Sequence, residues 1–229
     1  MKFIVIGLGN FGAALAINLT SLGHEVIAVD MDFHKVDYFK DKVYSTVCID
    51  PKDMHALATL PLKDTDVVIV AIGEDFGASV MITAQLKQMK VKKIIGRSIN
   101  ELHRTVLEAI GVDEIVRPEQ ETADRFSKKL ELKGYIDSFE IAEGYNIVEL
   151  IVPEMFIGMS VRESAFRKRF NIMIVTIMRE SEYKTVFGTS KMKRQALGVI
   201  TPETVFEKND ILVLYGNNDD IKKMSEITS

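Results

Sequence analysis

A glycine-rich turn near the N-terminus is the part of this sequence best suited to hold a phosphorylated ligand. Three glycines form the pattern G-x-G-x-x-G directly behind the apolar run 2–6 and ahead of an apolar helical segment. The first permits a sharp turn, the second leaves the backbone open to a phosphate, and the third lets the helix pack closely on the sheet, with its free N–H groups facing the anion. The alternative is an ordinary glycine turn. The predicted phosphate-binding residues are Gly7, Gly9, Asn10, Phe11 and Gly12.

An acidic residue after the second β-prone run completes this pattern. Asp30 stands directly behind the run 25–29, eighteen residues beyond Gly12. A carboxylate at the carboxyl end of this strand can accept both hydroxyl protons of an adenosine ribose. Strand, turn, helix, second strand and acid together predict an adenine-nucleotide site. Asp32, two residues further on, is interpreted as the N-cap of the next helix.

Further candidates follow the later β-prone runs, at the edge where ligands bind in parallel α/β sheets. In chain order they are Asp50, Ala71, Ile72, Gly73, Asp75, Arg97 and Glu119. Gly73 would let a ligand approach closely, and Arg97 would supply positive charge to a phosphate. The structural alternatives for Asp50 and Asp75 are a turn carboxylate and a helix cap. Those for Arg97 and Glu119 are a salt bridge with a nearby acid and an interaction with the helix dipole.

The elements that position these residues alternate between β and α patterns through the first half of the chain. Strands are predicted at 2–6, 25–29, 45–49, 66–72, 93–96 and 114–116. Helices are predicted at 11–22, 34–40, 54–60, 76–89, 101–110 and 118–132, the last with proline at its first position. This rhythm predicts an α/β fold, a Rossmann-like doubly wound parallel sheet covered by helices on both faces.

The pattern changes beyond residue 134. Strands are predicted at 138–141, 147–152, 172–178, 184–187 and 211–215, with a short helix at 160–169 and a terminal helix. Segment 188–198 is interpreted as a solvated loop, and the alternative for its cations Lys191, Lys193 and Arg194 is an anion-binding rim or a contact with a partner. We therefore predict two domains: a nucleotide-binding domain of residues 1–134 and a small α+β domain of residues 135–229.

The composition argues against several classes of protein. A net charge of -4 over 229 residues gives no support to nucleic-acid binding. The purest apolar run, 67–72, is too short to cross a bilayer, and residue 2 already begins a strand, so we expect neither a membrane span nor a signal peptide. The single cysteine, Cys48, can form no internal disulfide, which favours a soluble cytoplasmic protein. The histidines lack the spacing of a metal site and are expected at the surface; they are His24, His34, His55 and His103.

Catalytic groups are scarce in this sequence. The second predicted domain contains no His and no Cys, and no Y-x-x-x-K pair that could serve hydride transfer. Neither a G-x-S-x-G elbow nor a Walker loop occurs. We predict a binding protein and not an enzyme. The alternatives are an NAD(P)-dependent oxidoreductase and a generic Rossmann-type nucleotide sensor.

Short segments in both predicted domains match segments of a known protein family in their order and spacing. They are residues 5–12, 23–26, 29–30, 50–51, 71–75, 95–97, 107–113, 117–119, 160–161, 170–172 and 199–202. On these segments the whole chain resembles the regulatory, nucleotide-binding subunits of the bacterial Trk/Ktr potassium-uptake systems, which are built from RCK domains. The resemblance implies a cytosolic regulatory subunit that gates a separate potassium-translocating membrane subunit and associates peripherally with the membrane through it.

The resemblance also has implications for the ligand. ATP or ADP is the implied nucleotide, with Asp50 near the adenine amine. Because Asn10 stands where the family often has an arginine, AMP and NAD(H) stay open. In some relatives the small domain holds cyclic di-AMP; Arg167 and Pro202 fit that ligand here, whereas Met173 does not.

The resemblance finally implies a homodimer that assembles into an eight-membered ring. The helix predicted at 118–132 carries more apolar residues than a connecting segment needs: Ala123, Phe126, Leu130 and Leu132. The alternative is that these side chains pack between the two domains.

Overall fold

The structure, a computed structural model, describes residues 1–131, 135–184 and 190–227. The chain divides into two compact units, Met1–Glu121 and Thr122–Ser229. The domain boundary predicted at 134/135 adjoins residues 132–134, which lie outside the described part, and it stays a prediction.

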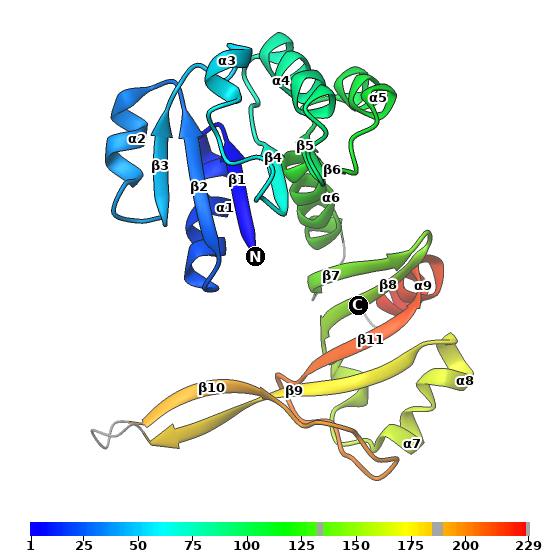
Figure 1. Ribbon diagram of the computed structural model, residues 1–229. Helices are drawn as coiled ribbons and strands as arrows, with labels where there is room; N and C mark the ends of the chain where they lie inside the picture. The colour runs from blue at the N-terminus through cyan, green and yellow to red at the C-terminus, as the bar shows by residue number, and fades with distance from the viewer. Residues whose placement is uncertain (132–134, 185–189, 228–229) are drawn as a thin grey trace. The chain divides into compact units, whose positions relative to one another are not determined.

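The first unit is built on a six-stranded parallel sheet (Figure 1). Its strands are β1 (Lys2–Ile6), β2 (Glu25–Asp30), β3 (Ser45–Cys48), β4 (Val67–Val70), β5 (Ile94–Arg97) and β6 (Glu114–Val116). Their order in the sheet is β3-β2-β1-β4-β5-β6, which is the order typical of dinucleotide-binding folds. The Rossmann-like, doubly wound sheet predicted from the sequence is therefore confirmed.

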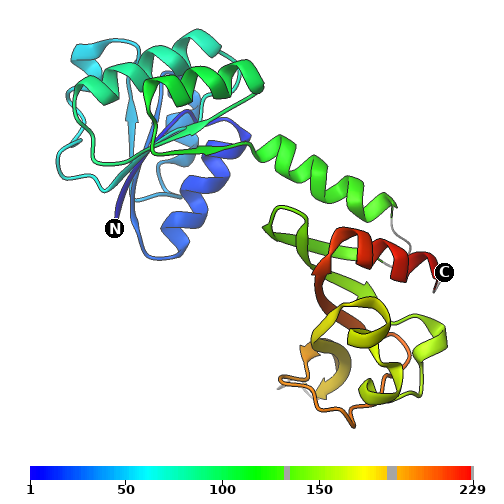
Figure 2. The same ribbon diagram turned by 90° about the vertical axis from the view of Figure 1, so that its right-hand side faces the viewer.

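Helices connect successive strands and cover the sheet. They are α1 (Asn10–Ser21), α2 (Phe33–Phe39), α3 (Met54–Leu57), α4 (Phe76–Gln88) and α5 (Glu101–Ile110), and α6 (Pro118–Glu131) follows the last strand. Figure 2 shows α4 and α5 running side by side over the sheet. All six begin within one residue of the predicted start, and α3 ends at Leu57, three residues before the predicted end.

The sheet is buried on both faces because its strands alternate apolar residues between two cores. Ile4 and Ile6 of β1 pack into one hydrophobic cluster with Val68 and Val70 of β4. Val5 lies in the other cluster, with Val67 and Ile69 among its neighbours. Successive side chains of a strand point to opposite faces, so an unbroken apolar run such as 67–70 requires cover on both sides.

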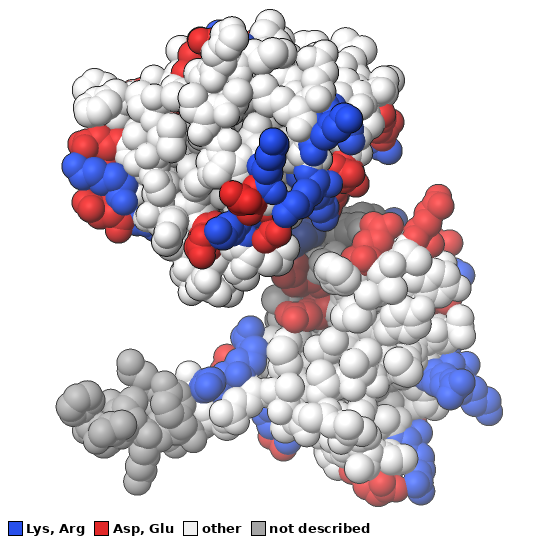
Figure 3. All heavy atoms as spheres, viewed as in Figure 1, with Lys and Arg blue, Asp and Glu red and all other residues white. Residues whose placement is uncertain are grey.

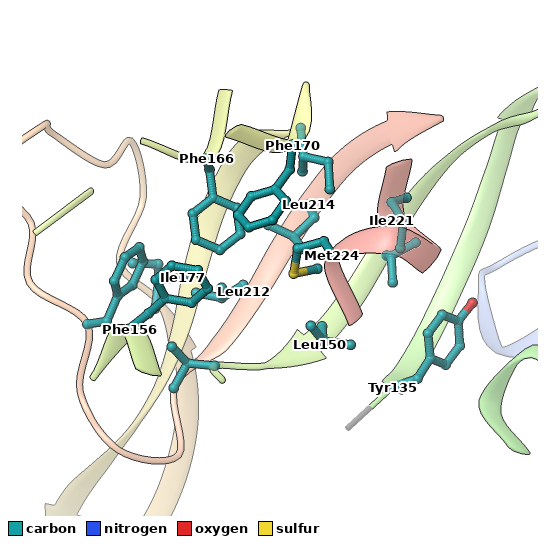
Figure 4. Close-up of a cluster of buried hydrophobic side chains, with 14 residues drawn as sticks. Tyr135, Leu150, Phe156, Phe166, Phe170, Ile177, Leu212, Leu214, Ile221 and Met224 are labelled. Carbon is teal, nitrogen blue, oxygen red and sulfur yellow. The ribbon is translucent and has the colours of Figure 1, made fainter. Parts of the chain in front are cut away.

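The second unit contains a five-stranded antiparallel sheet with small helices, as predicted for the α+β domain. Its strands are β7 (Tyr135–Ala142), β8 (Tyr145–Ile151), β9 (Met173–Lys184), β10 (Ser190–Ala196) and β11 (Ile211–Asn217), in the order β10-β9-β11-β8-β7. The helices are η1 (Glu154–Phe156), α7 (Val161–Ser164), α8 (Phe166–Phe170) and α9 (Asn218–Ile227). Figure 4 shows aromatic rings of η1 and α8 packed with aliphatic side chains of β9 and β11.

Two sequence predictions for this unit are wrong. The helix predicted at 160–169 is two short helices, because Ala165 adopts a left-handed conformation with φ of 49° and breaks it. The segment interpreted as a solvated loop contains β10, in which Lys193 and Arg194 pair with β9. Of the strand predicted at 184–187, residue 184 ends β9 and residues 185–187 lie outside the described part.

Candidate functional site

A cleft of about 540 Å³ opens at the carboxyl edge of the parallel sheet. It lies where the strand order reverses between β1 and β4, the position at which open α/β sheets bind ligands. Most of the predicted site residues line it together: Gly7, Gly9, Asn10, Asp30, Asp50, Ala71, Ile72, Gly73, Asp75, Arg97 and Glu119. Phe11 and Gly12, also predicted, are not among the lining residues.

The three glycines of the turn have different surroundings, and glycine serves a different purpose at each position. Gly7 has a φ of 100°, a conformation that L side chains rarely adopt. A Cβ on Gly12 would overlap the Gly7 carbonyl oxygen and lie 2.9 Å from the Ala71 Cβ, so α1 can approach the sheet only with glycine there. A Cβ on Gly9 would meet no atom within 4 Å, because that position faces the open cleft.

The N-terminus of α1 faces the cleft without a side-chain cap. Gly9 is its N-cap and makes no side-chain hydrogen bond, and the first turn holds no acidic residue. By contrast, α2 and α4 are capped by Asp32 and Asp75, whose carboxylates accept hydrogen bonds from backbone N–H groups. Uncapped N–H groups and the helix dipole make such a terminus suited to an anion.

Asp30 lines the cleft and is held in place by hydrogen bonds from two backbone N–H groups. Its Oδ2 accepts a hydrogen bond from the Leu8 N–H at 2.7 Å, and its Oδ1 accepts one from the Asp32 N–H at 2.9 Å. Only 8% of the residue is exposed, and the Lys35 Nζ lies 3.8 Å from Oδ2. Each carboxylate oxygen can accept a second hydrogen bond, so the side chain keeps acceptors for ligand hydroxyl groups.

The other predicted acids have structural roles as well as a place in the cleft. Asp50 Oδ1 accepts a hydrogen bond from the Lys52 N–H at 3.0 Å, as expected of a turn carboxylate. Asp75 Oδ1 accepts one from the Ala78 N–H at 2.9 Å and is the N-cap of α4. Asp32 caps α2, as predicted, and also lines the cleft.

Arg97 reaches the cleft from the end of β5 and forms a salt bridge with Glu119, in the first turn of α6. Its Nη1 donates to the Ala71 carbonyl at 3.2 Å, and its guanidinium lies 5.7 Å from the centre of the Phe11 ring. A Cβ on Gly73 would lie 2.5 Å from the same Nη1. Glycine at position 73 is therefore what allows the guanidinium to pack against the end of β4.

Sequence reasoning missed several residues of the cleft: Met31, Lys35, Pro51, Lys52, Glu74, Ala78 and Ile82. Most of them stand within two residues of a predicted site residue, and this closeness in sequence is the feature from which they could have been predicted. Together with the predicted ones they give the cleft six carboxylates and three cations, a formal balance of −3. The acids lie mainly beyond β2, β3 and β4, whereas Arg97 stands at the other side, after β5.

Other candidates from the sequence lie outside the cleft. His103 is fully buried and packs on Phe76, with ring centres 4.9 Å apart, so the expectation that all four histidines lie at the surface is wrong for this one. Burial lowers its pKa. Cys48 is a free, exposed thiol. Within the described ranges, no three His, Cys, Asp or Glu side chains are arranged to hold a metal ion, and no helix is long and apolar enough to span a membrane.

Charged side chains are intermixed on the surface. In the face drawn in Figure 3, Lys and Arg lie among Asp and Glu over the first unit. Three ion pairs join the strand starts and loops of that unit: Lys2–Glu25, Lys92–Asp66 and Lys93–Glu114. This face offers no continuous basic surface of the kind that binds nucleic acid.

The fold and the cleft define a two-unit protein whose first unit is a Rossmann-type ligand-binding domain. Residues 3–118 match the TrkA-N domain, and residues 147–229 match the TrkA-C domain. The chain therefore belongs to the family of TrkA-N and TrkA-C domain proteins, which confirms the resemblance seen in the sequence.

Full-length relatives support this assignment. The chain is 32% identical to the Ktr system potassium uptake protein C of Bacillus subtilis (strain 168) over 227 residues, covering 98% of this chain and 96% of that protein. It is 29% identical to the Ktr system potassium uptake protein A of the same bacterium over 222 residues, covering 97% of this chain and 94% of that protein.

Solved structures show the same fold. The GsuK RCK domain has a TM-score of 0.65 at 18% sequence identity, over 100% of this chain and 47% of that chain. The GsuK channel bound to NAD has a TM-score of 0.64 at 19% identity, over 100% of this chain and 39% of that chain. The chain thus spans less than half of the length of either GsuK chain.

Proposed function

We propose that this protein is a cytosolic regulatory subunit of a potassium uptake system. The observation that carries the proposal is the similarity to the Ktr system potassium uptake proteins C and A, which extends over nearly the whole of each chain. The membrane-translocating component is a separate partner, with which the protein associates at the membrane surface. It acts by binding and not by catalytic turnover.

The ligand of the cleft is an adenine nucleotide. The uncapped N-terminus of α1 and the open side of Gly9 receive the phosphates, and Arg97 adds positive charge. Asp30 accepts hydrogen bonds from the ribose hydroxyls, and Asp50 lies on the adenine side. ATP or ADP is the proposed ligand, and AMP and NAD(H) are the alternatives to be tested beside them.

The proposed active form is a homodimer that assembles into an eight-membered ring. Phe126 and Leu130 of α6 are 57% and 74% exposed, so their apolar surfaces are available to another copy of the chain. Nucleotides that favour different arrangements of the ring shift its population, and a tenfold difference in affinity supplies about 1.4 kcal/mol per site. Sedimentation at micromolar concentration tests the assembly, and a mass near that of one 25.8 kDa chain contradicts it.

Potassium uptake in living cells tests the function. A strain that lacks this gene and any redundant uptake system should take up potassium poorly, and the wild-type gene should restore uptake. The Asp30→Ala gene should restore it less well, because the nucleotide site is impaired. Normal uptake in the deletion strain contradicts the proposal. Calorimetric titration of the purified protein with ATP, ADP, AMP and NAD(H) identifies the ligand.

A further inference from the structure

A side chain that does not itself line the cleft is bonded to one of its walls. Gln85 lies on α4, three residues beyond Ile82, and is not among the lining residues. Its Nε2 donates a hydrogen bond at 3.0 Å to the backbone carbonyl of Lys52, 33 residues earlier in the chain. Because Lys52 lines the cleft, Gln85 joins α4 to a loop that faces the ligand.

The loop bonded to Gln85 is a tight turn of residues 50–53, between β3 and α3. The Asp53 N–H donates to the Asp50 carbonyl at 3.1 Å, with proline at position 51, and the Lys52 N–H donates to Asp50 Oδ1 at 3.0 Å. Both bonds join residues of the turn to one another and fix its shape. The bond from Gln85 reaches the turn from another element, so it fixes the position of the turn relative to α4.

α4 and the turn both contribute to the wall of the cleft. Ala78 and Ile82 line it from α4, and residues 50–52 line it from the turn. Gln85 follows Ile82 by three residues as Ile82 follows Ala78 by four, so the three side chains share one side of the helix. The separation of the two walls therefore depends on the hydrogen bond between Gln85 and Lys52.

Stability alone does not explain a glutamine at this position. A backbone carbonyl can accept a hydrogen bond only from the NH₂ end of the amide, so Gln85 Oε1 points away from Lys52. This oxygen is buried and has no hydrogen-bond partner among the described residues. An unpaired buried acceptor costs at least as much free energy as one ordinary hydrogen bond contributes, so an apolar side chain of similar size would stabilise the fold as well. What the glutamine adds is the fixed position of the turn.

We propose that Gln85 is a positioning residue that sets the preference of the cleft for adenine. By holding the Lys52 carbonyl it keeps the turn, and with it the Asp50 carboxylate, at a fixed separation from α4. A carboxylate accepts a hydrogen bond from the 6-amino group of adenine, whereas hypoxanthine has a carbonyl oxygen there that the carboxylate repels. A turn released from α4 discriminates less between the two bases. This inference rests on the proposed adenine-nucleotide function and on the place of Asp50 proposed with it.

Gln85→Met tests the role of the hydrogen bond, since methionine has a similar size and no donor. Gln85→Leu repeats the loss of the donor with a different shape, so that a packing defect of one variant does not decide the result. Gln88→Met is the matched control, because Gln88 is an exposed residue of the same helix and does not line the cleft. Calorimetric titrations of the full chain compare three pairs of ligands: ATP with ITP, ADP with IDP, and NAD with its hypoxanthine analogue.

The wild type should bind the adenine member of a pair more tightly than the hypoxanthine member. Gln85→Met and Gln85→Leu should reduce this ratio of affinities about fivefold, as expected when one hydrogen bond of ordinary strength is lost, with little change in the affinity for the hypoxanthine compound. Gln88→Met should keep the wild-type ratio. In an Asp50→Ala background, where the ratio is already reduced, Gln85→Met should reduce it no further.

An equal loss of affinity for both members of a pair would mean that Gln85 supports the fold and not the recognition of the base, and so would a loss of folding in both Gln85 variants. An unchanged ratio, an equal change in Gln88→Met, or a further reduction in the Asp50→Ala background also contradicts the inference. Wild-type protein that binds no adenine ligand contradicts the proposed function and this inference with it. Wild-type protein that binds the adenine ligands and does not distinguish them from the hypoxanthine ligands contradicts this inference alone.

Discussion

The carboxylate of Asp30 accepts a hydrogen bond from the backbone N–H of Leu8 at 2.7 Å, across 22 residues of sequence. The acid at the end of β2 thus holds the middle of the glycine turn that follows β1. Its second oxygen orders the start of the next loop through the Asp32 N–H. One side chain therefore fixes both the glycine turn and the following loop, while each of its oxygens can still accept a further hydrogen bond.

This double role predicts two losses in Asp30→Ala. Nucleotide affinity should fall about tenfold or more, because hydrogen bonds to a charged group are worth about 1.5–3 kcal/mol. The free energy of unfolding should fall as well, because two N–H groups lose their acceptor. Calorimetry and urea denaturation measure the two effects. Asp32→Asn is the control, since asparagine caps a helix as well as aspartate does; unchanged binding in Asp30→Ala would remove Asp30 from the site.

Alanine substitutions at two glycines of the turn should have different effects, one on the stability of the fold and the other on phosphate binding. In Gly12→Ala the new Cβ meets the Gly7 carbonyl, so the free energy of unfolding should decrease by about 1–3 kcal/mol, the usual cost of overpacking. In Gly9→Ala the Cβ enters open space, so the fold should keep its stability while phosphate binding weakens. Thermal denaturation with and without nucleotide distinguishes them. A Gly9→Ala protein that binds ATP and ADP as tightly as wild type would show that phosphates do not approach this position.

The sequence predicted the first unit well because each strand and helix there carries its own signal. Apolar runs of strand length alternate with helical periods, and a parallel sheet brings the ends of β1 to β5 to one edge. The glycine pattern and that topology together predicted most of the residues that line the cleft. Lys35 and Lys52 were missed because the sequence alone does not distinguish a lysine that lines a cleft from a lysine on the open surface.

The second unit shows what the sequence could not reveal. β10 lies at the edge of its sheet, and its side chains from Met192 to Ala196 are exposed, so it lacks the apolar alternation that marks a half-buried strand. Only its backbone pairing with β9 defines it. His103 was assigned to the surface because helical spacing alone does not reveal how closely α4 and α5 pack; the structure buries it between them.

Burial of His103 predicts a dependence of stability on pH. Its pKa is lowered by burial in the folded protein, whereas in the unfolded chain it is about 6.5. As the pH falls through about 6.5, the unfolded chain takes up a proton that the folded protein refuses, so the free energy of unfolding decreases until the lower folded pKa is reached. His103→Leu should flatten this part of the profile, and the exposed His55→Gln should not. Urea denaturation at several pH values measures it; parallel profiles for wild type and His103→Leu would contradict the assignment.

A buried ion pair should dominate the stability of the second unit. The Asp210 side chain is fully buried and accepts two hydrogen bonds from Arg179, from Nε at 2.8 Å and from Nη2 at 2.7 Å, as well as one from the Glu207 N–H. Asp210 also holds the pKa of Arg179 above its usual range. Asp210→Ala removes the acceptor of the Arg179 Nε–H and of a backbone N–H, whereas Arg179 keeps Glu207 and the Val205 carbonyl as partners, so we expect a loss of about 1.5–3 kcal/mol in the free energy of unfolding. The exposed pair Arg162–Glu203 gives the control, because Glu203→Gln breaks an ion pair that water already screens and should change stability little. Chemical denaturation of the full chain compares the two variants, and equal effects would mean that burial of Asp210 does not determine the strength of its ion pair.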